Sequence, residues 1–260
     1  MKILAVVNQK GGSGKSTFCA QAAHAGIEAG LRVLLVDLDP QGSLSTAFPS
    51  AEEVQGDVST ASALFAEGAT IAPELVKPGL SIIRKDALLR RLTVDNRAGL
   101  KRPGAYLKGL HAEFDLVIID TPGALGENVP TTTAALIAAD AVVCPFAVGV
   151  FEAEPLGQLW QHLQEIVSGG LNPRLRVLGL LPSKVNTASR EELSALDDLQ
   201  AHPYVGKFVL PVVLSEKAAV KQSIARGRAV WRGVRGNGHR TAAAEWQAAT
   251  SMVLKNLGVI

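Results

Sequence analysis

A glycine-rich segment at residues 8–17 has the residue types that bind a polyphosphate. Its three glycines leave backbone amides free to surround phosphate oxygens, and a helix beginning beyond them directs its positive end at the same place. Lys15 is placed to contact the terminal phosphates, and the Ser16 hydroxyl is a suitable ligand for Mg²⁺. The standard loop opens with a glycine where this chain has Gln9. The loop residues that we expect around the phosphates are Gly11, Gly12, Ser13, Gly14, Lys15, Ser16 and Thr17.

Two acidic segments are expected to complete this site. Asp120 ends an apolar run, where nucleotide-hydrolysing enzymes place the carboxylate that holds Mg²⁺. Asp37 and Asp39 follow an earlier apolar run. Two carboxylates beside a triphosphate are costly unless a metal and water use them. We therefore expect Asp39 to orient the attacking water and Asp37 to lie in the outer shell of the metal, although Asp37 could instead only cap a turn.

Apolar runs that alternate with helical segments must position these residues. We expect strands at residues 3–7, 32–37, 80–83, 116–120, 141–146, 177–181 and 207–210, and helices at 16–29, 86–111, 128–138, 152–167, 190–200 and 240–256. Runs this apolar are typical of parallel strands covered on both faces. The sequence therefore predicts an α/β fold, a doubly wound and mostly parallel sheet with helices on both faces and the ligand at the carboxyl ends of the strands. Residues 42–79 receive no assignment, and we expect residues 1–260 to form one domain without an N-terminal helix-turn-helix domain.

The composition favours a protein of the cytoplasm. The chain has 260 residues, 47% of them hydrophobic, and a formal net charge of +2. The first predicted strand leads directly into the phosphate loop, which argues against a signal peptide, and no apolar run is long enough to cross a bilayer. Cys19 and Cys144 are far apart and are expected to be buried thiols in a reducing compartment, not a disulfide or a metal site.

The motifs together resemble the ParA group of partition ATPases, whose phosphate loop is of the deviant Walker type. The resemblance rests on residues 10–17, 36–42, 118–122, 210–216 and 227–230. It implies ATP and Mg²⁺ as cofactors, and a homodimer that holds ATP between its subunits. It also implies that a ParB-like centromere-binding partner stimulates hydrolysis.

The same resemblance suggests roles for individual residues. Lys10 is expected to contact the nucleotide of the other subunit, so it joins Lys15 and Asp39 as a predicted catalytic residue. A lysine supplied across a dimer interface can stabilise transition-state charge as an arginine finger does. Asn186 and Pro211 are expected near the adenine.

Basic residues concentrate between residues 201 and 240, where Glu216 is the single acid. A patch of one sign suits DNA phosphates, and the scarcity of aromatic residues argues against stacking on single strands. We expect double-stranded DNA to bind without sequence preference, and the predicted contacts are Lys217, Lys221, Arg226 and Arg228. A solvated basic face without function is the alternative.

Other members of the same superfamily remain as alternatives. A MinD-like positioning ATPase should end in a basic amphipathic helix, but residues 241–255 contain one lysine and one glutamate, so we expect no membrane binding. An iron–sulfur reductase needs cysteines on loops, and a tyrosine autokinase needs a terminal tyrosine cluster. An ATP-dependent scaffold or filament without significant turnover is distinguished from an ATPase only by a measured rate.

Overall fold

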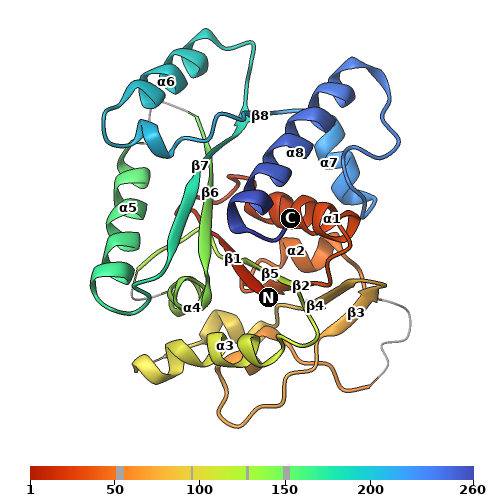
Figure 1. Cartoon of the computed structure of the whole chain (residues 1–260), viewed down its shortest axis with the longest axis vertical. Helices are drawn as coiled ribbons and strands as arrows, with labels where there is room; N and C mark the ends of the chain where they lie inside the picture. Colours follow the sequence, from red (N-terminus) through yellow and green to blue (C-terminus); the bar gives the residue numbers. More distant parts are fainter. Residues whose placement is uncertain (51–55, 95, 127–128, 149–152) are drawn as a thin grey trace.

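The computed structural model describes residues 1–50, 56–94, 96–126, 129–148 and 153–260. Its strands form an eight-stranded sheet in the order β3-β4-β2-β5-β1-β6-β7-β8 (Figure 1). The strands are β1 (Lys2–Val6), β2 (Val33–Asp37), β3 (Glu74–Lys77), β4 (Leu80–Ile83), β5 (Leu116–Asp120), β6 (Ala141–Ala147), β7 (Arg176–Val185) and β8 (Leu214–Ser215). β3 runs antiparallel to β4 and the other pairs are parallel, which confirms the predicted mostly parallel sheet.

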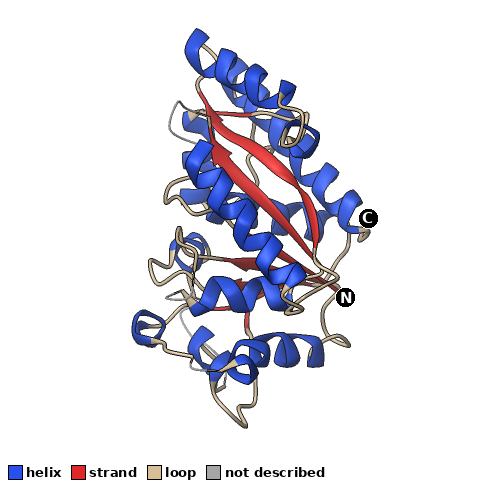
Figure 2. Ribbon diagram, turned by 90° about the vertical axis from the view of Figure 1, so that its left-hand side faces the viewer, coloured by secondary structure: helices blue, strands red, loops and turns tan. Residues whose placement is uncertain are grey.

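Helices pack on both faces of this sheet (Figure 2). The α-helices are α1 (Lys15–Glu28), α2 (Ser43–Ala47), α3 (Arg97–Gly109), α4 (Pro130–Ala138), α5 (Ala153–Ser168), α6 (Arg190–Ala201), α7 (Ala218–Ala225) and α8 (Gly236–Leu257). The 3-10 helices are η1 (Ala61–Phe65), η2 (Ala87–Arg91) and η3 (Gly206–Phe208). One apolar cluster joins the sheet to α1 and α8, and a second joins the opposite face to α3, α4 and α5. Among the described helices, none combines the length and hydropathy that a bilayer span requires.

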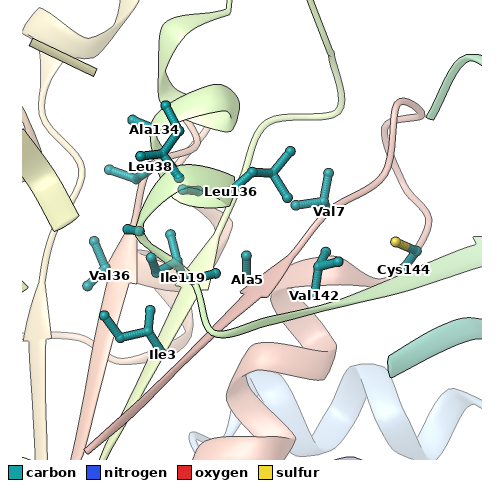
Figure 3. Close-up of a cluster of buried hydrophobic side chains, with 14 of the residues drawn as sticks. Ile3, Ala5, Val7, Val36, Leu38, Ile119, Ala134, Leu136, Val142 and Cys144 are labelled. Atoms are coloured by element: carbon teal, nitrogen blue, oxygen red, sulfur yellow. The ribbon is translucent and has the colours of Figure 1, made fainter. Parts of the chain in front are cut away.

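Both faces of the central strands are buried, which explains their unbroken apolar sequences. In β1 and the residue after it, Ile3, Ala5 and Val7 enter the cluster on the α4 side (Figure 3). Leu4 and Val6 enter the cluster on the α1 side. The thiols of Cys19 and Cys144 are both buried, as the sequence predicts. Burial raises the pKa of the Cys144 thiol to about 12, so this thiol stays protonated and inert.

The predicted strand at residues 207–210 is wrong. Residues 206–208 form η3, and Val209 makes only an isolated bridge with Leu180 before the ladder resumes at Leu214. Pro211 follows directly, and a proline has no N–H to donate to a neighbouring strand. The edge strand therefore begins further along the chain, at Leu214, than the hydrophobic pattern indicates.

The predicted helix at residues 86–111 is divided into η2 and α3. The Asp86 carboxylate accepts a hydrogen bond from the backbone N–H of Leu88, and the Asn96 side chain accepts one from the N–H of Gly99. Each bond caps the start of a separate helix. Residues 128 and 152, the first residues of two other predicted helices, lie outside the described residues. The unassigned region at 42–79 contains α2, η1 and β3.

His24 gives the fold a specific dependence on acid. Its ring lies in α1, 5.6 Å from the Phe48 ring between centroids, and burial followed by the charge of Lys77 lowers its pKa to about 4. Because the unfolded chain binds this proton near pH 6.5, folding stability decreases as the pH falls from 6.5 toward 4. We predict that the parent loses about 2 kcal/mol more than His24→Leu between pH 7 and pH 5, measured by urea unfolding. Equal losses in the two proteins would contradict a buried neutral imidazole.

Candidate functional site

The phosphate loop lies between β1 and α1, at the carboxyl edge of the sheet. Gly12 and Gly14 have left-handed φ values of 78° and 95°, which residues other than glycine rarely adopt. The loop forms one wall of an open cleft of about 560 Å³, whose other walls include Asp39, Pro122 and Lys184. This volume is in the range of small-molecule sites.

Neighbouring backbone holds the loop at close range. A Cβ atom at Gly123 would lie 2.6 Å from the Gly11 nitrogen, so the segment after β5 touches the loop backbone directly. On another side, a Cβ at Gly14 would lie 2.7 Å from Ser183 Oγ in β7. The Asn8 amide donates to the Pro145 carbonyl at 2.6 Å. The loop is therefore positioned by β5, β6 and β7 before any ligand binds.

Lys15 brings a buried positive charge to the base of this cleft. Its Nζ donates a 3.2 Å hydrogen bond to the Lys10 carbonyl inside the loop. Burial lowers the pKa of Lys15, and the charges of Asp120 and Asp39 oppose that effect. Ser16 and Thr17 follow on the first turn of α1, and both line the cleft. Lys10 itself is exposed beside the cleft.

Asp120 has the properties of a cation ligand. Both of its carboxylate oxygens are buried, and neither accepts a hydrogen bond of normal geometry from a described residue. Burial and the nearby charge of Asp37 raise the pKa of Asp120, while the Ser16 hydroxyl favours its ionised form. A buried carboxylate without well-formed hydrogen bonds is costly, and Mg²⁺ takes oxygen ligands.

The ligands for such a cation fit Mg²⁺ bound together with a nucleotide. Among the described residues, no group of three His, Cys, Asp or Glu side chains is arranged to hold a metal ion. A cation here would combine the Ser16 hydroxyl with phosphate oxygens and water, which is how Mg²⁺ is usually bound. The negative charge of Asp120 would stabilise the cation in that arrangement.

The other two carboxylates differ in environment. Asp37 stands opposite Asp120 in the β2–β5 register and is fully buried. It accepts hydrogen bonds from the Ser45 backbone N–H at 2.7 Å and from Ser45 Oγ at 2.6 Å, and so it caps α2. Asp39 is partly exposed at the wall of the cleft, where Oδ1 accepts from the Gln41 N–H at 2.8 Å. The contacts of Asp37 are therefore those of a capping residue. Asp39 is the carboxylate that faces the cleft.

A second cavity of about 260 Å³ adjoins the cleft and shares Gly14, Thr17 and Lys184 with it. It is mostly apolar and extends to Ser215 and Trp246, whose indole Nε1 is buried without a partner among the described residues. These features suit the base or sugar of a nucleotide better than its phosphates.

The predicted adenine residues do not line either of these cavities. The Asn186 backbone N–H donates to the Glu192 carboxylate, and Pro211 is exposed before β8. Sequence reasoning missed Ser183, Lys184 and Trp246, which lie on β7 and α8. Their part in the cavity depends on tertiary packing and left no motif in the sequence.

A basic cavity of about 600 Å³ lies between α7 and the start of α8. Three of the predicted DNA contacts line it, together with further basic side chains. The basic residues around it are Lys217, Arg226, Arg228, Arg232, Arg235 and His239. Lys221 lies on the other side, toward the apolar cavity, and pairs with Glu216 at 3.4 Å. Arg232 is partly neutralised by Glu28, with 2.7 Å between the charged atoms.

The contact between Gly123 and the loop can be tested by one methyl group. In Gly123→Ala the new Cβ meets backbone atoms of Gly11 and Lys10, which cannot rotate away as a flexible side chain would. Overpacking of this kind costs about 1–3 kcal/mol; if the loop bears that cost when it binds the nucleotide, ATP affinity falls roughly 5- to 150-fold in isothermal titration calorimetry. Gly109→Ala is the matched control, because a Cβ there meets nothing within 4 Å. Parental affinity in Gly123→Ala would show that the loop does not depend on this contact.

Comparisons with known proteins show the family of the chain. Residues 1–177 match the AAA_31 family, described as an AAA domain. The chain is 31% identical over 237 residues to the chromosome partitioning protein ParA of Caulobacter vibrioides, covering 88% of this chain and 86% of that protein. It is 33% identical over 236 residues to the chromosome-partitioning ATPase Soj of Thermus thermophilus, covering 87% and 86%.

A solved structure extends the likeness to the fold. Cobyrinic acid a,c-diamide synthase of Mycobacterium smegmatis, with a bound ATP analogue and magnesium, has a TM-score of 0.77 and 25% identity, covering 99% of this chain and 96% of that one. A P-loop fold, the acidic residues at the strand ends and the similarity to ParA and Soj lead to one conclusion. The chain belongs to the ParA/Soj/IncC family of partition ATPases.

Proposed function

We propose that this protein is a Mg²⁺-dependent ATPase that partitions DNA in the cytoplasm, with residues 1–260 acting as one ATPase domain. ATP binding joins two copies into a sandwich dimer, the dimer binds double-stranded DNA without sequence preference, and hydrolysis releases it. A ParB-like centromere-binding protein stimulates that hydrolysis. The observation that carries the proposal is the phosphate loop beside Asp120, a buried carboxylate whose oxygens accept no hydrogen bond of normal geometry from the described residues.

Each group at the cleft has a proposed role in hydrolysis. Lys15 holds the terminal phosphates, and Ser16 with Asp120 holds Mg²⁺, which when bound neutralises charge on the phosphate oxygens. Asp39 orients the attacking water, and its partly exposed place at the cleft wall supports this role. Asp37 acts on the outer shell of the metal while it caps α2.

The arrangement of α7 and α8 supports DNA binding over membrane binding. Trp246, Val253 and Leu254 of α8 are buried against α1 and the sheet, so this helix has no free apolar face along that side. The basic side chains around the cavity beside α7 are mostly exposed and fit the phosphates of a duplex.

The proposed roles of the two loop lysines differ, and mutation separates them. Lys10→Ala should bind Mg²⁺–ATP with near-parental affinity, because Lys15 still holds the phosphates of its own subunit. It should fail to dimerise with a non-hydrolysable analogue, and its turnover should fall by roughly 10³-fold, to the assay background. Light scattering after size-exclusion chromatography measures the dimer. Lys15→Ala should lose ATP binding altogether, and Lys108→Ala is the exposed control. A normal ATP-dependent dimer with normal turnover in Lys10→Ala would refute the role across the interface.

DNA binding should require ATP, ignore sequence and weaken steeply with salt. Each phosphate contact contributes about −0.9 to the slope of log affinity against log salt. Replacing Arg226, Arg228 and Arg235, three exposed residues around the basic cavity, with glutamine should flatten the slope by roughly 2–3 per subunit, measured on two unrelated duplexes by interferometry.

The matched control for that triple variant is Arg90, Arg91 and Lys101 changed to glutamine, which removes the same charge from exposed positions around η2 and α3. Lys217 and Lys221 are kept in both proteins, because both border the apolar cavity beside the phosphate loop. If the control flattens the slope as much as the test variant, net charge and not this patch binds DNA.

A further inference from the structure

Lys184 has an unusual backbone conformation. Its φ is 57°, and within the described ranges it is the only residue other than glycine with a positive φ. A left-handed conformation brings Cβ close to the following carbonyl oxygen, so residues other than glycine adopt it at an energetic cost. Such strain persists where the surrounding structure imposes it, and it is concentrated at functional sites.

The strain arises from an irregularity in β7. The register between β7 and β8 shifts between Ser183 and Val185. Ser183 is directed at Gly14 of the phosphate loop, whereas Val185 enters the apolar cluster on the other face of the sheet. In a regular strand, residues two positions apart, such as these, point to the same face of the sheet. The turn at Lys184 therefore lets the same strand support the loop and continue into the core.

A glycine would make this turn without strain, and the same strand provides the comparison. At the earlier register shift of β7, between its pairings with Val142 and Val143 of β6, the chain has Gly179 with φ 150°. Lysine at position 184 therefore needs a reason beyond backbone geometry. Its side chain is exposed and lies where the phosphate cleft meets the apolar cavity, since Lys184 lines both.

We propose that Lys184 is a nucleotide-binding residue whose ammonium group contacts the phosphate next to the sugar. Lys15 lines the phosphate cleft but not the apolar cavity, so it serves the terminal phosphates. Gly14, Thr17 and Lys184 line both, which places them where the α-phosphate of a nucleotide passes from one to the other. This inference rests on the proposed ATP binding and adds a second cation from the same subunit.

The test compares three replacements of Lys184 in the full chain. Asparagine tolerates a left-handed backbone but carries no charge, glycine removes both strain and charge, and arginine keeps the charge. Affinities for Mg²⁺–ADP and Mg²⁺–ATP are measured by calorimetry, and Tm is measured without nucleotide. Lys15→Ala and the exposed Lys108→Asn are controls.

We expect Lys184→Asn and Lys184→Gly to weaken ADP and ATP binding alike, by about 10-fold, the contribution of one charge-assisted hydrogen bond. Lys184→Arg should stay within about 3-fold of the parent. The Tm of Lys184→Gly should equal or exceed the parental value, because relief of strain offsets the added freedom of the unfolded chain. Loss of affinity without loss of stability identifies a ligand contact.

Several results would overturn the inference. Parental affinity in Lys184→Asn excludes a contact, and an arginine variant as weak as asparagine excludes a role for the charge. Weakening of ATP binding alone would place the ammonium at the terminal phosphates instead. A Tm that falls together with affinity in Lys184→Gly would make the role structural. If Lys15→Ala loses ATP binding while Lys184→Asn keeps it, the role of Lys184 is refuted and the proposed ATPase function stands. If the parent binds no ATP, both the role of Lys184 and the proposed function are refuted.

Discussion

Three ionisable side chains are removed from water where the sheet meets the phosphate loop, and the rest of the site depends on how their charges are balanced. Lys15, Asp37 and Asp120 are all buried, and the two aspartates stand opposite each other on paired strands. Ser45 satisfies Asp37, and the Lys10 carbonyl accepts from Lys15, but Asp120 is left without a normal hydrogen bond from the described residues. A cation and an anion bound together would complete this set, because the cation neutralises Asp120 and the anion pairs with Lys15. Binding of the cation and the anion would therefore also balance the buried charges of the site.

The fold keeps these charges in place through backbone contacts. Parallel strands end at a common edge, which brings the residues after β1, β2 and β5 together although they are far apart in the sequence. Gly123 then approaches the loop backbone more closely than a Cβ would allow, and Gly14 lies against the Ser183 hydroxyl. The loop is consequently supported on its sheet side and open toward the cleft, a geometry suited to holding phosphates in one position.

Much of the fold and the phosphate loop could be predicted from the sequence, because continuous apolar runs and a glycine-rich loop are local signals. The errors occurred where distant parts of the chain decide the outcome. Pro211 delays the last strand, and the cap at Asn96 divides a helix that periodicity had joined. Lys184 lies in an ordinary stretch of sequence, and only the packing of Ser183 on Gly14 and of Val185 in the opposite core reveals its strained turn. The expected roles of Asn186 and Pro211 came from resemblance alone, and neither residue lines the two cavities beside the loop.

The position of α7 gives the proposed dependence of DNA binding on ATP a physical route within one subunit. Val220 and Ile224 of this helix line the apolar cavity beside the phosphate loop, while Gln222 and Ser223 line the basic cavity. Lys217, at its start, borders both. A nucleotide base that fills the apolar cavity would press on one side of an eight-residue helix whose other side carries the basic surface. A packed helix responds to such a contact by a small shift of the whole element. Dimerisation would then bring together basic surfaces that the nucleotide has already repositioned, so the two proposed effects of ATP would reinforce each other.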